Sequence, residues 1–299
     1  MRSHRRVQDY VTVALFLAPA FILLLVLLVY PILRSVYFSL FNWNGLGPAV
    51  DFVGLGNFRR VLADKVFVRA VGDCLLIVVL SLAIQLPVAL AVAIMVGRDL
   101  PGRAVFRTIF FMPYVLSEVI TGIIWTGLFS ADPSRGLINA LWVLIPGAHP
   151  QNFLSDVNQV MWCVFVVLSW KYFGLHMLLY LAGLQNIPRE IEEAALIDGA
   201  NPWQMISKIT IPLLSGTIRT TVYLSVLGAL TQFNLIWIMT RGGPVNASEF
   251  MATYMYRYGF VRFQLGYASA VALVLLLICL AFSVAYLRIA RRGEYLGMI

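Results

Sequence analysis

The chain has 299 residues, of which 61% are hydrophobic and 12% are charged; its formal net charge is +8 and its mean hydropathy is +0.85. A soluble globular protein averages about 45–50% apolar and about 25% charged residues. The composition therefore excludes an ordinary soluble domain and indicates an integral membrane protein. The positive charge comes from arginines that flank apolar segments, so we expect no nucleic-acid partner.

Six apolar segments are long enough to cross a membrane, which takes about 20 helical residues. The sequence therefore predicts an all-α membrane protein with six transmembrane helices, at Val11–Leu33, Val71–Val96, Ala104–Phe129, Val160–Leu184, Leu213–Met239 and Tyr267–Leu287. The first segment is too long for a signal peptide and has no small-residue cleavage site after it, so we expect an uncleaved anchor.

Lysine and arginine near the segment ends predict the orientation of the chain. With the N-terminus inside, the inner regions hold more of these residues than the outer loops do. The bias is clearest at the two ends of the chain, which carry Arg2, Arg5, Arg6, Arg288, Arg291 and Arg292. An even number of spans then places both termini in the cytoplasm, and we expect a multi-pass protein of the cell membrane, either inner or plasma.

A polar island, residues 189–212, lies between the fourth and fifth apolar segments and predicts two short helices with a sharp break. Pro188 suits the first turn of the first helix, and Gly199 accepts the left-handed conformation that commonly ends a helix. Asn201 is a good N-cap and Pro202 a good first residue for the second helix, which runs toward Ile209. One alternative is an amphipathic helix at the membrane interface that has no protein partner.

The chain lacks the motifs of an enzyme or an ATPase. Its three lysines, Lys65, Lys171 and Lys208, do not follow glycine, so a phosphate-binding Gly-Lys-Ser/Thr loop is excluded. The histidines are too scattered for a helical zinc motif, and the three cysteines lie inside apolar segments. We expect no catalytic residue, no metal and no cofactor on this chain, so ATP that drives it must be hydrolysed by another polypeptide.

The island reads Glu193-Ala194-Ala195, three residues, Gly199, nine residues, then Ile209-Thr210-Ile211-Pro212. It resembles the EAA loop of the membrane-spanning subunits of ATP-binding-cassette (ABC) importers, with Ile211 where that family has Leu. Further segments are similar to sugar-importer permeases of the maltose and glycerol-3-phosphate branch, and in particular to the first of its two permease types. These segments are Phe16–Ala20 with Tyr30-Pro31, Phe52–Phe58, Thr240–Pro244 and Gly266–Ala270.

This resemblance implies a type I ABC importer fold with a cytoplasmic coupling helix between helices 4 and 5. It implies an N-terminal anchor helix and extracellular segment at 1–66, and a type-1 transmembrane domain at 67–292 that contains the coupling loop 189–212. The implied partners are a second permease subunit, two copies of an ABC ATPase that bind ATP and Mg, an extracellular solute-binding protein, a sugar and membrane lipid.

The same resemblance gives the coupling residues their roles. Glu193 would pair with a basic residue of the ATPase, and Gly199 would allow close backbone approach. Ala194 and Ala195 would form a small docking surface. Ile209 and Pro212 close the pattern at the start of the fifth span.

Polar and aromatic residues at mid-depth in a membrane usually face a cavity or another helix. Because sugars are held by aromatic faces and by amide or hydroxyl groups, Trp170, Tyr172, Ser225 and Gln232 are candidates for lining the substrate path. Ser225 and Gln232 are seven residues apart, so a continuous helix would place them on one face. The alternative for each residue is a hydrogen bond between packed helices, worth about 0.6–2 kcal/mol.

Two charges, Glu118 and Lys171, fall in the middle of the third and fourth spans. An ion pair between them would reduce a burial cost of about 2.5–3.5 kcal/mol per charge. The alternative is that Lys171 faces the substrate path.

The sequence thus predicts the pore-forming permease of an ATP-driven sugar importer that works by alternating access. The alternative is an autonomous secondary transporter or channel, which should show inverted repeats, interrupted helices and clustered carboxylates. A membrane-embedded enzyme would need a nucleophile, base or metal constellation, and none appears.

Overall fold

The computed structural model describes residues 2–97 and 102–295, and the side chains of residues 2–12, 103 and 291–295 lie outside the described part. The orientation prediction therefore rests on Arg2, Arg5, Arg6, Arg291 and Arg292 as sequence alone. Within the described ranges the chain is built from helices and helical turns, with one isolated bridge between Phe41 and Phe52. An all-α fold is thus confirmed.

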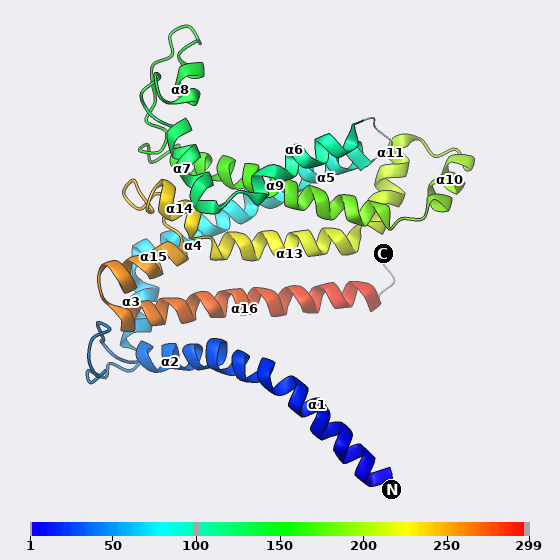
Figure 1. Cartoon of the computed structure of the whole chain (residues 1–299). Coiled ribbons are helices and arrows are strands. Elements are labelled where there is room, and N and C mark those ends of the chain that lie inside the picture. Colours follow the sequence, from blue (N-terminus) through cyan, green and yellow to red (C-terminus); the bar gives the residue numbers. More distant parts are fainter. Residues whose placement is uncertain (1, 98–101, 296–299) are drawn as a thin grey trace. The chain divides into compact units, whose positions relative to one another are not determined.

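The helices follow one another along the chain with short connections (Figure 1). Their bounds are α1 Arg2–Leu24, α2 Tyr30–Ser39, α3 Gly56–Ala63, α4 Lys65–Leu80, α5 Leu86–Gly97, α6 Arg103–Val115, α7 Glu118–Leu128, α8 Leu137–Trp142, α9 Val160–Gln185, α10 Arg189–Ile197, α11 Pro202–Met205, α12 Ile211–Leu213, α13 Ser215–Thr231, α14 Asn234–Met239, α15 Met251–Tyr256 and α16 Leu265–Tyr295. Single π-helical turns, with i to i+5 hydrogen bonds, occur at η1 Leu25–Val29, η2 Ser81–Gln85, η3 Ile206–Thr210 and η4 Arg257–Val261.

Four of the six predicted spans are present as long apolar helices. By length and composition the described chain has four helices able to cross a membrane, at Val13–Ser39, Lys65–Gly97, Val160–Gln185 and Leu265–Ala290, or up to six if each of two bent helix pairs is one span. The six predicted spans agree with the structure when each bent pair is counted as one span, and the third and the fifth of them are broken.

The third predicted span divides into α6 and α7, which meet at 97°. Leu116 and Ser117 are extended, with ψ of 144° and 142°, so the helix ends at Val115 and starts again at Glu118. Pro113 lies inside the last turn of α6, and its missing N–H leaves the Ile109 carbonyl without its helical donor. A break at membrane depth also leaves backbone carbonyls that need hydrogen-bond donors from elsewhere in the chain.

The predicted fifth span, Leu213–Met239, also differs from a single helix. A 67° bend separates Pro202–Leu213 from α13, and α13 then ends at Thr231 because Gln232 is extended, with ψ of 129°. The short helix α14 follows at Asn234. Neither proline nor glycine marks this second break in the sequence, so hydropathy alone could not predict it.

The helices pack as two units, one formed by the chain up to Ala63 with Met255–Val274 and the other by Asp64–Tyr254 with the residues from Leu275 onward. In the first unit, the Asn57 side chain donates to the carbonyls of Ser39 and Phe41, both at 2.9 Å. A Cβ on Gly266 would overlap the Phe41 carbonyl, so glycine is required there. This packing does not test the predicted division into 1–66 and 67–292, which stays a prediction.

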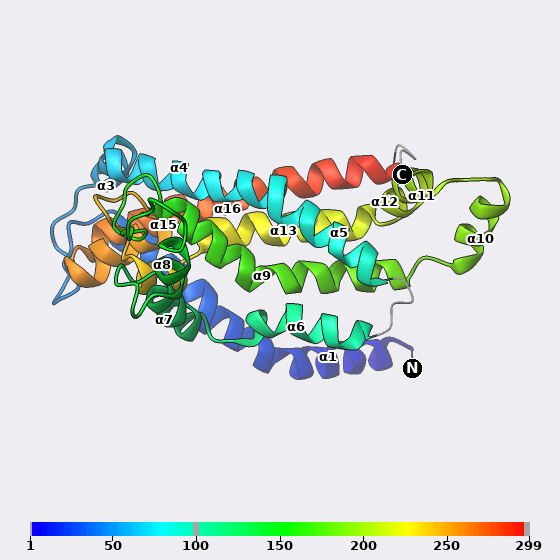
Figure 2. The same cartoon turned by 90° about the horizontal axis from the view of Figure 1, so that it is seen from above.

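In the second unit, α9 is the central helix and contacts α5, α6 and α13, while α14 packs on α7. Figures 1 and 2 both show α10 projecting beyond the ends of α9 and α13, with α7 and α8 at the opposite end. Tyr180 of α9 is 1% exposed and its hydroxyl accepts a hydrogen bond from Thr221 of α13 at 2.8 Å. The polar island, residues 189–212, is therefore attached to one end of a packed helix bundle.

Gly174 of α9 lets α6 approach its backbone. A Cβ at this position would overlap the Phe110 carbonyl and lie 2.8 Å from Phe111 Cα. We expect Gly174→Ala to destabilise the protein by about 1–3 kcal/mol, the usual cost of overpacking, because backbone cannot give way as a side chain can. Gly228→Ala in α13 is the matched control, since a Cβ there meets nothing within 4 Å. Thermal unfolding in detergent should separate the two variants, and equal melting temperatures would contradict the close α6–α9 contact.

Candidate functional site

The polar island folds as two short helices, as predicted. Pro188 is the residue before α10, and Glu190 and Glu192 lie in the first turn, where negative charge stabilises the helix dipole. Asn201 caps α11 by accepting from the Gln204 backbone N–H at 2.8 Å, while the Gln204 side chain accepts from the Asn201 N–H at 2.9 Å. This reciprocal pair is a capping box, which fixes the start of the second helix.

The turn between the two helices is a Schellman motif centred on Gly199. The Gly199 N–H donates to the Leu196 carbonyl at 3.1 Å and the Ala200 N–H donates to the Ala195 carbonyl at 2.9 Å. Gly199 has a φ of +80°, which favours glycine over any other residue. A Cβ on Gly199 would meet nothing within 4 Å. The fold therefore favours glycine here for its left-handed backbone conformation, and not because another part of the chain packs against it.

The surface of this helix-turn-helix is unusually apolar for a polar segment. Leu196 is 62% exposed, Ile197 86% and Trp203 75%. Ala194 is also exposed, whereas Ala195 is buried, at 9% exposure, inside the turn. The predicted Ala194–Ala195 docking surface therefore differs from the structure at Ala195, which packs inward because its carbonyl closes the Schellman motif. Exposed apolar residues of this kind suit contact either with a partner protein or with the membrane interface.

The second helix, α11, leads into α13 through the π-helical turn η3 and the short helix α12. Ile209 and Pro212, the last residues of the predicted pattern, are half-buried, and Thr210 between them is buried. The helix-turn-helix of α10 and α11 is thus joined to α13 through partly buried residues.

A cavity of about 630 Å³ lies behind the two helices. Glu192, Glu193, Arg107 and Arg189 line it together with apolar residues of α5, α9 and α11. The Arg107 Nε is buried and has no hydrogen-bond partner among the described residues. Glu193 thus shares a cavity lining with Arg189, four residues earlier on α10, and with Arg107, which is distant in the chain.

Lys171 is buried in the middle of α9, at 3% exposure, and its Nζ donates to backbone carbonyls at the break between α6 and α7. The acceptors are Pro113 and Tyr114, both at 3.3 Å, and Leu116. The last carbonyls of a helix have no partner within the helix. The ammonium group of Lys171 satisfies the carbonyls that the break leaves free.

The predicted Glu118–Lys171 ion pair is not formed. Among the described residues no nitrogen–oxygen contact within 4.0 Å joins the two side chains. The Glu118 carboxylate instead accepts a hydrogen bond from the Tyr172 hydroxyl, and the Lys171 Nζ lies 5.9 Å from the Tyr172 ring centroid. The ion pair is replaced because the helix break offers Lys171 three closer acceptors. The alternative, in which Lys171 faces the substrate path, is not supported by its burial either.

Of the four candidate path residues, Tyr172 donates to Glu118, and the other three have different surroundings. Ser225 is buried, and its Oγ lies 2.8 Å from Ser81 Oγ, so it joins α13 to η2, as the packing alternative predicted. Gln232 lies beyond the end of α13, so it does not share a helical face with Ser225. Its Nε2 is buried and has no hydrogen-bond partner among the described residues. Trp170 is 37% exposed and packs edge-on against Trp125.

Three features were not predicted from the sequence. They are the hydrogen bonds from Lys171 to backbone carbonyls, the position of Arg107 in the same cavity lining as Glu193, and a second cavity at the ends of α7 and α14. Pro113 inside an otherwise continuous apolar segment was the one available signal for the first. The other two depend on residues far apart in the chain, and single-sequence patterns carry no sign of them.

A bundle of apolar helices with two broken spans and a polar helix-turn-helix at one end is compatible with a membrane transport subunit, and the comparisons with known proteins give the class. Residues 85–294 match the family described as "Binding-protein-dependent transport system inner membrane component". The chain belongs to this family. It is therefore a multi-pass ABC transporter permease, a transport subunit rather than an enzyme.

Relatives match over almost the whole chain. The lactose transport system permease protein LacF of Rhizobium radiobacter is 35% identical over 287 residues, which cover 94% of each chain. The multiple sugar-binding transport system permease protein MsmF of Streptococcus mutans is 30% identical over 280 residues, covering 93% of this chain and 95% of MsmF. A permease chain in the crystal structure of a bacterial ABC transporter involved in the import of the acidic polysaccharide alginate superposes with a TM-score of 0.84, at 23% identity, covering 98% of this chain and 99% of that one.

Proposed function

We propose that the chain is the pore-forming permease subunit of an ATP-driven sugar importer that works by alternating access. The observation that carries the proposal is the helix-turn-helix of α10 and α11, with its exposed Leu196, Ile197 and Trp203 and its Glu-Ala-Ala…Gly pattern. The names of LacF and MsmF support a sugar as the substrate.

The proposed assembly contains a second permease subunit, two copies of an ABC ATPase and an extracellular solute-binding protein. ATP and Mg would bind on the ATPase subunits, since this sequence has no phosphate-binding loop. Both termini and the coupling segment would lie in the cytoplasm. Closure of the ATPases would then move α13 through the packed turn at Thr210 and open the path outward.

We propose Trp170, Tyr172 and Gln232 as residues of the substrate path, and we assign Ser225 to helix packing. Tyr172 and Gln232 lie at the two helix breaks, and irregular backbone at membrane depth is tolerated only where it is buried in protein or lines a cavity. The aromatic ring of Trp170 and the unpartnered Nε2 of Gln232 have the chemistry that suits a sugar.

A thermal-shift measurement on the cognate solute-binding protein tests the substrate class. We expect a mono- or oligosaccharide, or a related polyol, to raise its melting temperature, because a ligand that binds only the folded state stabilises it by mass action. Protection by amino acids or peptides, with none by sugars, would overturn the sugar assignment.

Glu193→Lys tests the coupling role of the loop. We expect this charge reversal to weaken the association with the ATPase by about tenfold or more, since losing one charge-assisted hydrogen bond costs about 1.5–3 kcal/mol. Glu190→Lys, one turn away and exposed, is the matched control. Co-purification of the ATPase with each variant gives the comparison. Equal recovery from both would place the partner contact elsewhere.

A further inference from the structure

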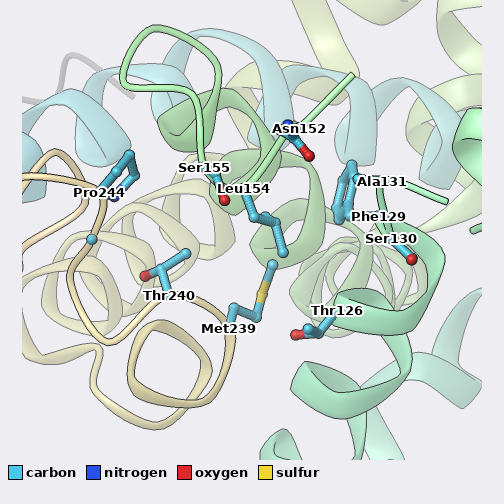
Figure 3. Close-up of a pocket in the computed structure, with 11 residues that line it drawn as sticks. Thr126, Phe129, Ser130, Ala131, Asn152, Leu154, Ser155, Met239, Thr240 and Pro244 are labelled. Carbon is cyan, nitrogen blue, oxygen red and sulfur yellow. The ribbon is translucent and has the colours of Figure 1, made fainter. Parts of the chain in front are cut away.

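A second cavity, of about 510 Å³, lies at the end of the bundle opposite the coupling helices. Three segments surround it: the end of α7, the stretch before α9, and the loop after α14 (Figure 3). Its volume falls in the range of about 300–1,000 Å³ that is typical of small-molecule sites. In the proposed orientation this end is extracellular, where substrate arrives.

The cavity offers neutral hydrogen-bonding groups. The side chains of Ser130, Asn152 and Ser155 line it and make no hydrogen bond within the described part of the chain. The Thr126 hydroxyl donates to the Gly122 carbonyl at 2.8 Å, so its oxygen can still accept. Hydroxyl and amide groups both donate and accept, which matches the alternating hydroxyls of a saccharide ring.

No ionisable side chain belongs to the described lining of the cavity. Charged residues adjoin the lining along the chain: Asp132 and Arg135 are exposed and pair with each other at 3.7 Å, and Asp156 and Arg241 follow Ser155 and Thr240, but none of these four lines the cavity. Hydrogen bonds from the Ser134 backbone and side chain hold the pKa of the Asp132 carboxyl below its ordinary value. A uronate or phosphate ligand would find no compensating cation in the lining.

Aromatic rings join the cavity to the proposed substrate path. Phe129, which lines the cavity, lies 5.5 Å from Trp125, and Trp125 lies 5.5 Å from Trp170, measured between ring centroids. On the other side Phe129 lies 5.9 Å from Phe153, which contacts Trp142 at 6.1 Å. The row thus runs from α8 through the cavity wall to α9. Aromatic faces of this kind pack on the apolar faces of sugar rings.

We infer that this cavity is an outer subsite for an uncharged saccharide, which binds there before it moves along the aromatic row toward Trp170. The inference rests on the proposed function as a sugar importer and adds to it the substrate class: a neutral sugar, rather than an anionic sugar or a sugar phosphate. Ser130, Asn152 and Ser155 supply the hydrogen bonds, and Phe129 supplies the apolar wall.

Uptake by the complete importer in proteoliposomes, with its ATPase and binding protein, tests the subsite. The probes are lactose, maltotriose and diacetylchitobiose as neutral sugars, and glycerol 3-phosphate and an alginate pentasaccharide as anions. We expect at least one neutral probe to be imported and neither anion. Import of an anion without any neutral sugar would overturn the inference. Import of none of the five would contradict the sugar-importer function on which it rests.

Ser155→Trp fills the cavity and should lower the maximal uptake rate of the imported sugar by about tenfold. Val157→Trp is the matched control, two residues away, half-exposed and outside the lining. The double variant Asn152→Ala with Ser155→Ala removes two hydrogen-bonding groups without adding bulk, and should lower the rate less. Thermal unfolding in detergent separates loss of fold from loss of the site. Wild-type uptake in both cavity variants, with a neutral sugar still imported, would overturn the subsite and leave the proposed function standing.

Discussion

Gly199→Asp is expected to abolish uptake while the protein remains in the membrane at its wild-type level. A left-handed residue other than glycine costs about 1–2 kcal/mol, and Asp is among the residues that tolerate this region best. Since a Cβ at this position meets nothing of its own chain, the fold should survive. The lost function would then come from the partner, whose approach to the turn a carboxylate would block.

Gly147→Asp is the matched control for this variant. Gly147 has a φ of +83° and open space around the position of a Cβ, but it lies in the loop after α8, at the other end of the bundle. Uptake and co-purification of the ATPase should be measured together for both variants, with Gly199→Asn to separate charge from size. Unchanged uptake and unchanged ATPase association in Gly199→Asp would remove the docking role of the turn.

Lys171→Met is expected to destabilise the protein and to abolish uptake. Burying one charge costs about 2.5–3.5 kcal/mol on insertion scales, so the loss of the charge by itself should stabilise the protein. The substitution also leaves the carbonyls of Pro113, Tyr114 and Leu116 without their donor, at about 1–3 kcal/mol for each buried acceptor. We expect the second effect to dominate because three acceptors are involved, and the break between α6 and α7 to lose its geometry.

Lys171→Arg keeps the donors and should be milder, and Lys65→Met, at an exposed position at the start of α4, should have no effect. Thermal unfolding in detergent and uptake in cells give the two readouts. If Lys171→Met melts at the wild-type temperature, the helix break does not depend on this lysine.

The two broken spans bear on the alternative of a secondary transporter, for which interrupted helices were expected. Both breaks exist, so this criterion does not separate the two classes of transporter. Membership of the binding-protein-dependent family does separate them, since it assigns the chain to the ABC permeases. In either class a break places polar backbone beside a cavity, and here Tyr172 and Gln232 lie at the two breaks.

Features that depend on local sequence were predictable. Pro188, Gly199 and Asn201 each act within one turn of their own position, so the ends of α10 and α11 follow from the residues alone. The break at Leu116 was not predicted because the residues on both sides are equally apolar, and the carbonyls that Lys171 binds lie 55 to 58 residues away. Pairing of a side chain with distant backbone leaves no periodic trace in the sequence.

Ser225 and Ala195 show the same limit. The sequence left a substrate-path role and a packing role open for Ser225, and in the structure its Oγ lies 2.8 Å from the Oγ of Ser81, 144 residues away. The family resemblance gave Ala195 a docking role, and in the structure it is buried and its carbonyl accepts from the Ala200 N–H. A contact between distant residues and the burial of one small side chain leave no sign in the local sequence.

The central claim is that energy reaches this permease from a separate ATPase through the helix-turn-helix at Gly199. Reconstitution of the chain in proteoliposomes with the second permease and the ATPase, with loaded binding protein outside and ATP inside, measures it most directly. We predict that the sugar accumulates only when both ATP and the ATPase are present, and that a proton or sodium gradient cannot replace them. Accumulation driven by an ion gradient in the absence of the ATPase would contradict the account.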